Sequence, residues 1–258
     1  MADRRGKCFI VAEIGMNHMG DPGYADDYVR SLIEARPDGV TFQVREKDYY
    51  RTQAKGESTQ LDDRYYRGAC KAVRDAGIWF GVALCDPYRA AFFAEIGADF
   101  YKILSKDIGD GNLIDAVAAS GKPVHVSTGM SDEEGIASFL QNSAEIASQV
   151  SLIHTQLSYD DADTNLRAIG RLHDRFGIPV GFGSHSTDIN ALYAAIGFDP
   201  AAVFFYVKGA RPIQHKDEDH AVALAAAKDV IRELRRLETM LGDGVKQKMP
   251  NRIAAQAR

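Results

Sequence analysis

The chain has 258 residues, of which 45% are hydrophobic and 26% are charged, and its formal net charge is −5. This composition is typical of a globular protein with a sizeable core. The sequence has no basic stripe and no interleaved arginine and aromatic residues, which argues against a nucleic-acid partner. No apolar stretch is as long as a membrane span, and Glu13 interrupts the short apolar run near the N-terminus, unlike in a secretory signal.

The three cysteines, Cys8, Cys70 and Cys85, are an odd number without the spacing of a metal site. They fit a reducing compartment better than a disulfide framework. We therefore expect a cytoplasmic protein.

Short runs rich in β-branched and aromatic residues alternate with longer helical patterns along the chain. These runs predict strands at residues 8–14, 39–44, 78–84, 99–104, 123–128, 150–155, 179–184 and 202–207. Between them, apolar residues repeat every three or four positions. This spacing predicts helices at residues 26–35, 67–77, 88–97, 112–121, 132–148, 165–177, 188–197 and 220–242. Several of these segments end at glycine, as helices often do.

Eight successive strand–helix units in this length predict a (β/α)8 TIM barrel of the α/β class. The strands are apolar on both faces, as expected for parallel strands covered by helices. A doubly wound open sheet has the same periodicity and is the alternative. We expect residues 1–241 to form one barrel domain and the polar residues 242–258 to form a tail or docking arm.

Active sites of such barrels form at the C-terminal ends of the strands, so polar residues there are candidate site residues. They include cations, hydroxyls, imidazoles and a carboxylate, a mixture that suits an anionic, oxygen-rich small molecule. The candidates are Glu13, Asn17, His18, Gln43, Arg45, Cys85, Asp86, Lys102, Ser105, Lys106, Ser127, Thr128, His154, Gln156, Tyr159, Ser184, His185 and Lys208.

Several of these residues lie in longer motifs, namely "AEIGMNHMGD", "FQV", "YKILSKDIGD", "GKPVHVSTGM" and "NLRAIGRLHDRFGIPVGFGSHS". In order and spacing, from residue 8 to about 241, the chain resembles the N-acetylneuraminate (sialic acid) synthase family. The resemblance implies a barrel that condenses phosphoenolpyruvate with the open-chain aldehyde of an amino sugar. The products would be a nine-carbon 2-keto acid and phosphate. It also implies a divalent metal, usually Mn²⁺ or Mg²⁺, that holds and polarises the aldehyde.

The resemblance assigns roles to individual residues. It implies that Glu13, Lys102 and His185 are catalytic, with Glu13 moving a proton or orienting water beside the reacting carbons. His185 matches one metal-binding histidine. After the eighth strand, either His215 or His220 could supply a second imidazole, and we place His215 in the predicted metal site. The predicted substrate-binding residues are Asn17, Gln43, Ser105, Ser127, Thr128, Tyr159 and Lys208. The resemblance implies that Lys102, Ser105 and Ser127 hold the phosphate.

The sequence also departs from the family pattern. Thr41 replaces a lysine, Gly183 replaces a phosphate-binding serine, and Gly209 stands where the second metal histidine is expected. The antifreeze-like domain that follows the barrel in the family is not found after residue 241. A homodimer packed through helix faces is compatible with the sequence.

Two other functions therefore stay open. The barrel could be a metal-independent aldolase or lyase that forms a Schiff base on Lys102 or Lys208. Alternatively, it could be a non-catalytic protein that binds a sugar phosphate.

Overall fold

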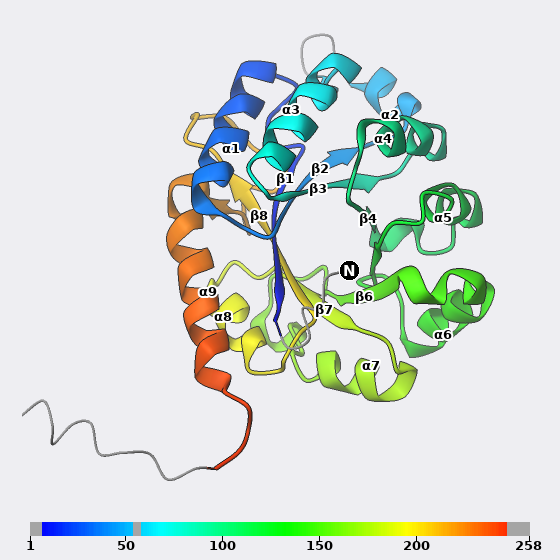
Figure 1. Ribbon diagram of the computed structural model, residues 1–258, viewed down its shortest axis with the longest axis vertical. Coiled ribbons are helices and arrows are strands. Elements are labelled where there is room, and N and C mark those ends of the chain that lie inside the picture. The colour runs from blue at the N-terminus through cyan, green and yellow to red at the C-terminus, as the bar shows by residue number, and fades with distance from the viewer. Residues whose placement is uncertain (1–6, 54–57, 247–258) are drawn as a thin grey trace, which may run out of the picture.

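The strands of the computed structural model, which describes residues 7–53 and 58–246, form a closed parallel barrel (Figure 1). They pair in chain order, and β8 pairs with β1, with Phe9 opposite Ala202 and Glu13 opposite Tyr206. This closure confirms the predicted TIM barrel and excludes the open sheet. The strands are β1 (Phe9–Gly15), β2 (Gly39–Val44), β3 (Trp79–Leu84), β4 (Phe100–Ile103), β5 (Val124–Ser127), β6 (Val150–His154), β7 (Val180–Gly183) and β8 (Ala202–Lys208).

The helices form an outer layer around these strands (Figure 1). Aspartates begin several of them: the side chains of Asp21, Asp62, Asp110 and Asp132 each accept a hydrogen bond from a backbone N–H of the first turn. The α-helices are α1 (Pro22–Ala35), α2 (Lys47–Thr52), α3 (Asp63–Asp75), α4 (Ala90–Ile96), α5 (Gly111–Ala118), α6 (Glu133–Asn142), α7 (Ala168–Phe176), α8 (Asn190–Ile196) and α9 (Ala227–Leu241). Short 3₁₀ helices span Pro87–Arg89, Ser105–Asp107, Ala144–Gln149, Asp161–Asp163 and Leu224–Ala226.

Several features differ from the predicted elements. Helices α1 and α3 begin four residues earlier than predicted, and the helix predicted at residues 132–148 divides into α6 and the 3₁₀ helix Ala144–Gln149. The short helix α2 was not predicted. The last helix begins at Ala227 rather than at residue 220, because β9 (Val222–Ala223) pairs with the end of β8. Part of the segment predicted as the start of the last helix is therefore a β-strand, although its apolar spacing is that of a helix.

Aromatic side chains fill the N-terminal half of the barrel interior. The ring of Phe100 packs against Phe9 and His125, and His125 packs against Phe204. Gly81 leaves room for Phe100, since a Cβ at this position would lie 2.3 Å from that ring. The barrel is thus closed at this end, and polar side chains higher on the strands face only the C-terminal end.

Helix α9 ends at Leu241, and the division of the chain into a barrel and a tail stays a prediction. Of the expected tail, residues 247–258 lie outside the described residues. Within the described ranges, no helix is both long and apolar enough to cross a membrane.

Candidate active site

A buried ion pair lies at the centre of the barrel's C-terminal half. Lys102 Nζ lies 2.7 Å from both carboxylate oxygens of Glu13, and the two side chains are only 4% and 2% exposed. Strand register explains the meeting. Glu13 is opposite Thr41 on one side and Tyr206 on the other, and all three side chains face the interior, as does Lys102 on β4. The Lys102 ammonium also lies 5.4 Å from the ring centroids of Phe204 and Tyr206.

Hydroxyl groups gather beside this pair at the ends of β4, β5 and β6. The backbone N–H of Gly129 donates to Ser105 Oγ at 3.0 Å. Thr155 is next to both, because a Cβ at Gly129 would lie 2.9 Å from the Thr155 methyl and 3.1 Å from Ser105 Oγ. Within the described ranges, the buried Thr155 hydroxyl has no hydrogen-bond partner, and the buried Ser127 makes no side-chain hydrogen bond. An unpaired buried hydroxyl such as that of Thr155 is rare, so it marks a candidate position for binding a polar ligand.

Gly183, at the end of β7, borders the same cluster. A Cβ there would lie 2.9 Å from Ile153 Cγ2 and 3.7 Å from Thr155 Oγ1. The Thr155 hydroxyl therefore reaches the space next to the position where the family has a serine. We did not predict Thr155. The available signal was its alternation with the interior-facing Ile153.

Two histidines meet on the other side of the ion pair. The rings of His185 and His220 have centroids 4.5 Å apart, and both pack against the ring of Tyr206. Burial lowers the pKa of His185 to about 3 and that of His220 to about 4. Asp217 Oδ1 lies 3.8 Å from His220 Nε2. Burial and the nearby Glu13 carboxylate raise the pKa of Asp217 to about 7.

His215, which we predicted as a metal ligand, lies elsewhere. Its Nε2 is 2.8 Å from the hydroxyl of Tyr24, and its Nδ1 is 2.8 Å from a carboxylate oxygen of Glu218. Both ring nitrogens are therefore engaged within the protein. The structure gives the position beside His185 to His220.

Two other predicted site residues hold the loop that follows β8. The Asn17 amide donates to the carbonyl of Val207 at 2.9 Å and accepts from the backbone N–H of Asp217 at 3.0 Å. Lys208 Nζ donates to the backbone carbonyl and to the carboxylate of Glu218, at 2.6 and 2.5 Å. In this conformation both side chains organise the loop.

The remaining predicted residues differ in their freedom to bind a substrate. The Thr128 hydroxyl donates to the carbonyl of Ile153 at 3.0 Å, whereas Tyr159 is 55% exposed, on the rim beside His220. Gln43 is buried and makes no side-chain hydrogen bond within residues 7–53 and 58–246. Burial raises the pKa of the Cys85 thiol to about 12, so this cysteine is unsuited to act as a nucleophile.

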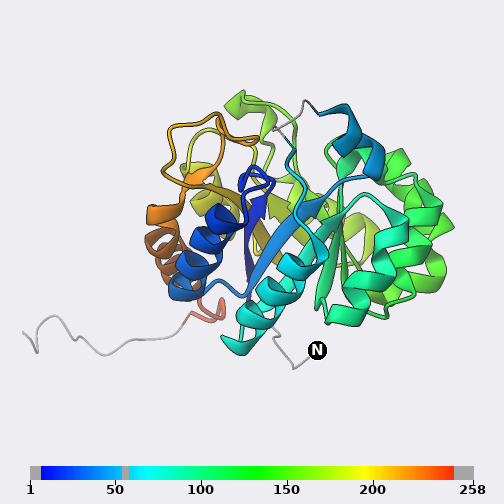
Figure 2. The same cartoon turned by 90° about the horizontal axis from the view of Figure 1, so that it is seen from above.

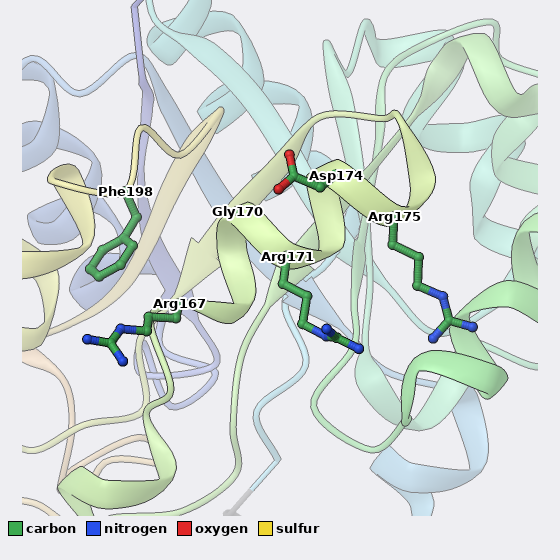
Figure 3. A pocket seen from close by; sticks show the side chains of 6 residues that line it. All are labelled: Arg167, Gly170, Arg171, Asp174, Arg175 and Phe198. Carbon is green, nitrogen blue, oxygen red and sulfur yellow. The ribbon is translucent and has the colours of Figure 1, made fainter.

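A hollow on the outer helical layer is separate from these groups (Figure 3). It lies along α7 and Phe198, and three arginines point from the helix around it. Two of them, Arg171 and Arg175, already pair with Glu133. The barrel mouth is the better candidate site, because the buried ion pair lies there together with the unpaired Thr155 hydroxyl and His220 ring.

The NeuB family model matches residues 28–246. The chain belongs to the NeuB family. Among relatives, N-acetylneuraminate-9-phosphate synthase of Homo sapiens is 25% identical over 96% of this chain and 75% of its own length. N,N'-diacetyllegionaminic acid synthase of Legionella pneumophila is 25% identical over 97% of this NeuB chain and 78% of its own. These names confirm the resemblance and the class of synthase-type enzymes.

Solved structures show the same fold. The N-acetylneuraminic acid synthetase of Leptospira borgpetersenii, in complex with citrate, superposes with a TM-score of 0.86 at 23% identity, over 97% of this NeuB chain and 90% of that one. A truncated 3-deoxy-D-arabino-heptulosonate 7-phosphate synthase of Thermotoga maritima has a TM-score of 0.73 at 16% identity, over 94% and 92%. At these identities the likeness concerns the fold alone.

Proposed function

We propose that this chain condenses phosphoenolpyruvate with an amino-sugar aldehyde to give a 2-keto acid of the nonulosonic type and phosphate. The observation that carries the proposal is a buried lysine on β4 at the same end of the barrel as three hydroxyl groups, those of Ser105, Ser127 and Thr155, at the ends of β4, β5 and β6. A phosphate would supply acceptor oxygens to these hydroxyl groups and would share the Lys102 side chain with Glu13. The family membership supports the same reaction class.

In this reaction the enol carbon C3 forms a bond to the aldehyde carbon, whose oxygen becomes a hydroxyl by taking up a proton. Water adds to C2 and loses one proton. The C2–O bond to phosphate then breaks with its electron pair leaving on phosphate, and the new C2 hydroxyl becomes the keto group by losing its proton to the departing phosphate. Glu13 would take the proton from the attacking water. The Lys102 ammonium, together with the Ser127 and Thr155 hydroxyls, would stabilise the charge on the leaving phosphate.

The donor set also fits a divalent metal at the aldehyde. Both imidazoles of the His185–His220 pair have depressed pKa values and are neutral at pH 7, the form that binds metal. A cation bound there would polarise the aldehyde carbonyl.

The geometry offers less support for a Schiff-base aldolase. A Schiff base needs a lysine whose amino group is free to attack a carbonyl carbon, but Lys102 Nζ and Lys208 Nζ each contact a carboxylate. In addition, Lys208 is held in place by Glu218 outside the hydroxyl cluster.

Phosphate release tests the proposal. The enzyme is incubated with phosphoenolpyruvate, Mn²⁺ and a panel of N-acetylated amino-sugar aldehydes, with and without a terminal phosphate. We expect release only when an aldehyde is present. Lys102→Met should abolish it, and the surface variant Lys71→Met should not. No release with any aldehyde, together with no binding of phosphoenolpyruvate in calorimetry, would contradict the proposal.

A further inference from the structure

The ring of His220 is buried without a bonding partner. Its side chain is 6% exposed, and neither ring nitrogen has a hydrogen-bond partner within the described ranges. A buried imidazole normally satisfies at least one nitrogen, because leaving a polar group unpaired is costly. His215, only five residues earlier, has partners for both of its nitrogens. Packing alone therefore does not account for His220.

The loop that carries His220 is fixed from several sides. Its residue Asp217 is held by Asn17 of the turn after β1, and Glu218 is held by Lys208 at the end of β8. At its C-terminal end, β9 pairs with β8. Figure 2 shows this loop, in gold and orange, next to the blue turn that follows β1. The place of His220 against His185 is thus built by the fold.

We propose that His185 and His220 bind one divalent cation between them, with His220 supplying from the loop the imidazole that Gly209 cannot supply. The proposal rests on the proposed function for its purpose, since the cation would lie at the aldehyde. The position of the proposed cation is argued from the structure alone. The ring centroids are 4.5 Å apart, and the Asp217 carboxylate lies beside the pair to balance the charge.

The two imidazoles do not complete a metal site. Among the described residues, no three His, Cys, Asp or Glu side chains form a ligand set. Water or substrate oxygens must fill the other positions, which keeps the coordination open, as in catalytic metal sites. Imidazole donors alone favour Zn²⁺, Fe²⁺ or Ni²⁺, whereas oxygen atoms of water, of the substrate and of the nearby Asp217 carboxylate would also admit Mn²⁺, which serves as the paramagnetic probe.

Binding of Mn²⁺ without substrate tests the inference. The six-line electron paramagnetic resonance signal of free Mn²⁺ is followed as the full chain is titrated. We expect one bound ion per chain, at least a tenfold weaker affinity in His185→Gln and in His220→Gln, and no change in His173→Gln. His173 is the matched control, because it is an exposed histidine on α7.

Two further measurements do not depend on activity. At 100 times the wild-type dissociation constant, Mn²⁺ should raise the Tm of the wild-type chain by roughly 5–11 °C and that of His220→Gln by at most roughly 3–6 °C, because the variant binds at least tenfold more weakly. Pulsed spectra of the wild-type complex should show coupling to imidazole nitrogen, which requires no variant.

The two proposals can fail separately. Mn²⁺ affinity unchanged in His220→Gln, a bound ion without nitrogen coupling, or no binding at millimolar Mn²⁺ would each overturn the metal site, even if phosphate release continues. Nitrogen-coupled Mn²⁺ that needs His220, without phosphate release from any aldehyde, would support the site and contradict the proposed reaction.

Discussion

Replacement of Lys102 by methionine should strongly destabilise the barrel. Glu13 would keep a carboxylate that is 2% exposed and has lost its counter-ion, with Asp217 as a second acidic neighbour. Removing one partner of a buried ion pair costs about 3–5 kcal/mol, because the remaining charge is left without compensation. For a chain of this size, that corresponds to a fall in Tm of roughly 6–20 °C, measured by scanning calorimetry.

The double variant Glu13→Leu with Lys102→Met separates stability from function. Because it removes both charges and fills the space with apolar atoms, most of the lost stability should return. Phosphate release should stay absent. Lys71→Met is the matched control, since the Lys71–Asp75 pair is exposed on α3 and should contribute less than about 1 kcal/mol.

Two results would refute this reasoning. One is a Tm for Lys102→Met within 2 °C of the wild-type value, roughly the smallest shift that 1 kcal/mol produces in a chain of this size. The other is a double variant no more stable than the weaker single variant. The first would mean that water solvates the pair, and the second that the two residues act independently. Recovery of stability without turnover would instead indicate that the pair is kept for chemistry.

Three further outcomes are expected. Gly81→Ala should lower the free energy of unfolding by about 1–3 kcal/mol, because the new Cβ would clash with the ring of Phe100. Gly170→Ala, on α7 with no atom near its Cβ position, should instead stabilise the chain by up to about 1 kcal/mol. Thermal unfolding of both variants measures the difference. Burial lowers the pKa of His125 from 6.5 to about 4, so as the pH falls the unfolded chain takes up this proton before the folded chain does. In urea unfolding, the free energy of unfolding should therefore fall by about 3 kcal/mol between pH 6.5 and pH 4 because of this residue. The His125→Gln variant should not show this contribution. Thr155→Val should weaken phosphoenolpyruvate binding about tenfold in calorimetry without lowering Tm, since the lost hydroxyl has no partner within the described chain.

The strands could be predicted from the sequence because each is a short run rich in β-branched and aromatic residues, bounded by segments with helical apolar spacing. Each predicted strand lies within two residues of the observed one at either end, and the parallel order follows from alternation. The exceptions were local. Helix α2 is a charged six-residue segment with little apolar periodicity, and β9 depends on contact with β8. Pairing between distant segments is not visible in spacing alone.

The site was predictable where strand ends define it and less so where a loop does. Glu13, Lys102 and Ser127 face one interior because of strand register, which the sequence implies once the barrel is recognised. The choice between His215 and His220 depended on the path of a loop. That path is set by contacts with the turn after β1 and with α1, and no local pattern in the loop encodes them.

The departures from the family pattern have a steric basis in this chain. A Cβ at Gly209 would lie 2.2 Å from the hydroxyl of Tyr24, the group that holds His215, so a histidine cannot stand there while this contact exists. With that position closed, the loop brings His220 to the ring of His185.

Gly183 follows the same logic. A side chain there would press on Ile153 Cγ2 at 2.9 Å, while the unpaired hydroxyl of Thr155 faces the neighbouring space. At both positions a glycine leaves room for a neighbouring side chain, Tyr24 at Gly209 and Ile153 at Gly183. A residue of the type found in the family at that position lies elsewhere in the same site, namely His220 and the hydroxyl of Thr155. Considered alone, Gly183 and Gly209 suggest that a phosphate-binding hydroxyl and a metal-binding imidazole have been lost. Read with Thr155 and His220, they favour a site whose donors have moved to new positions.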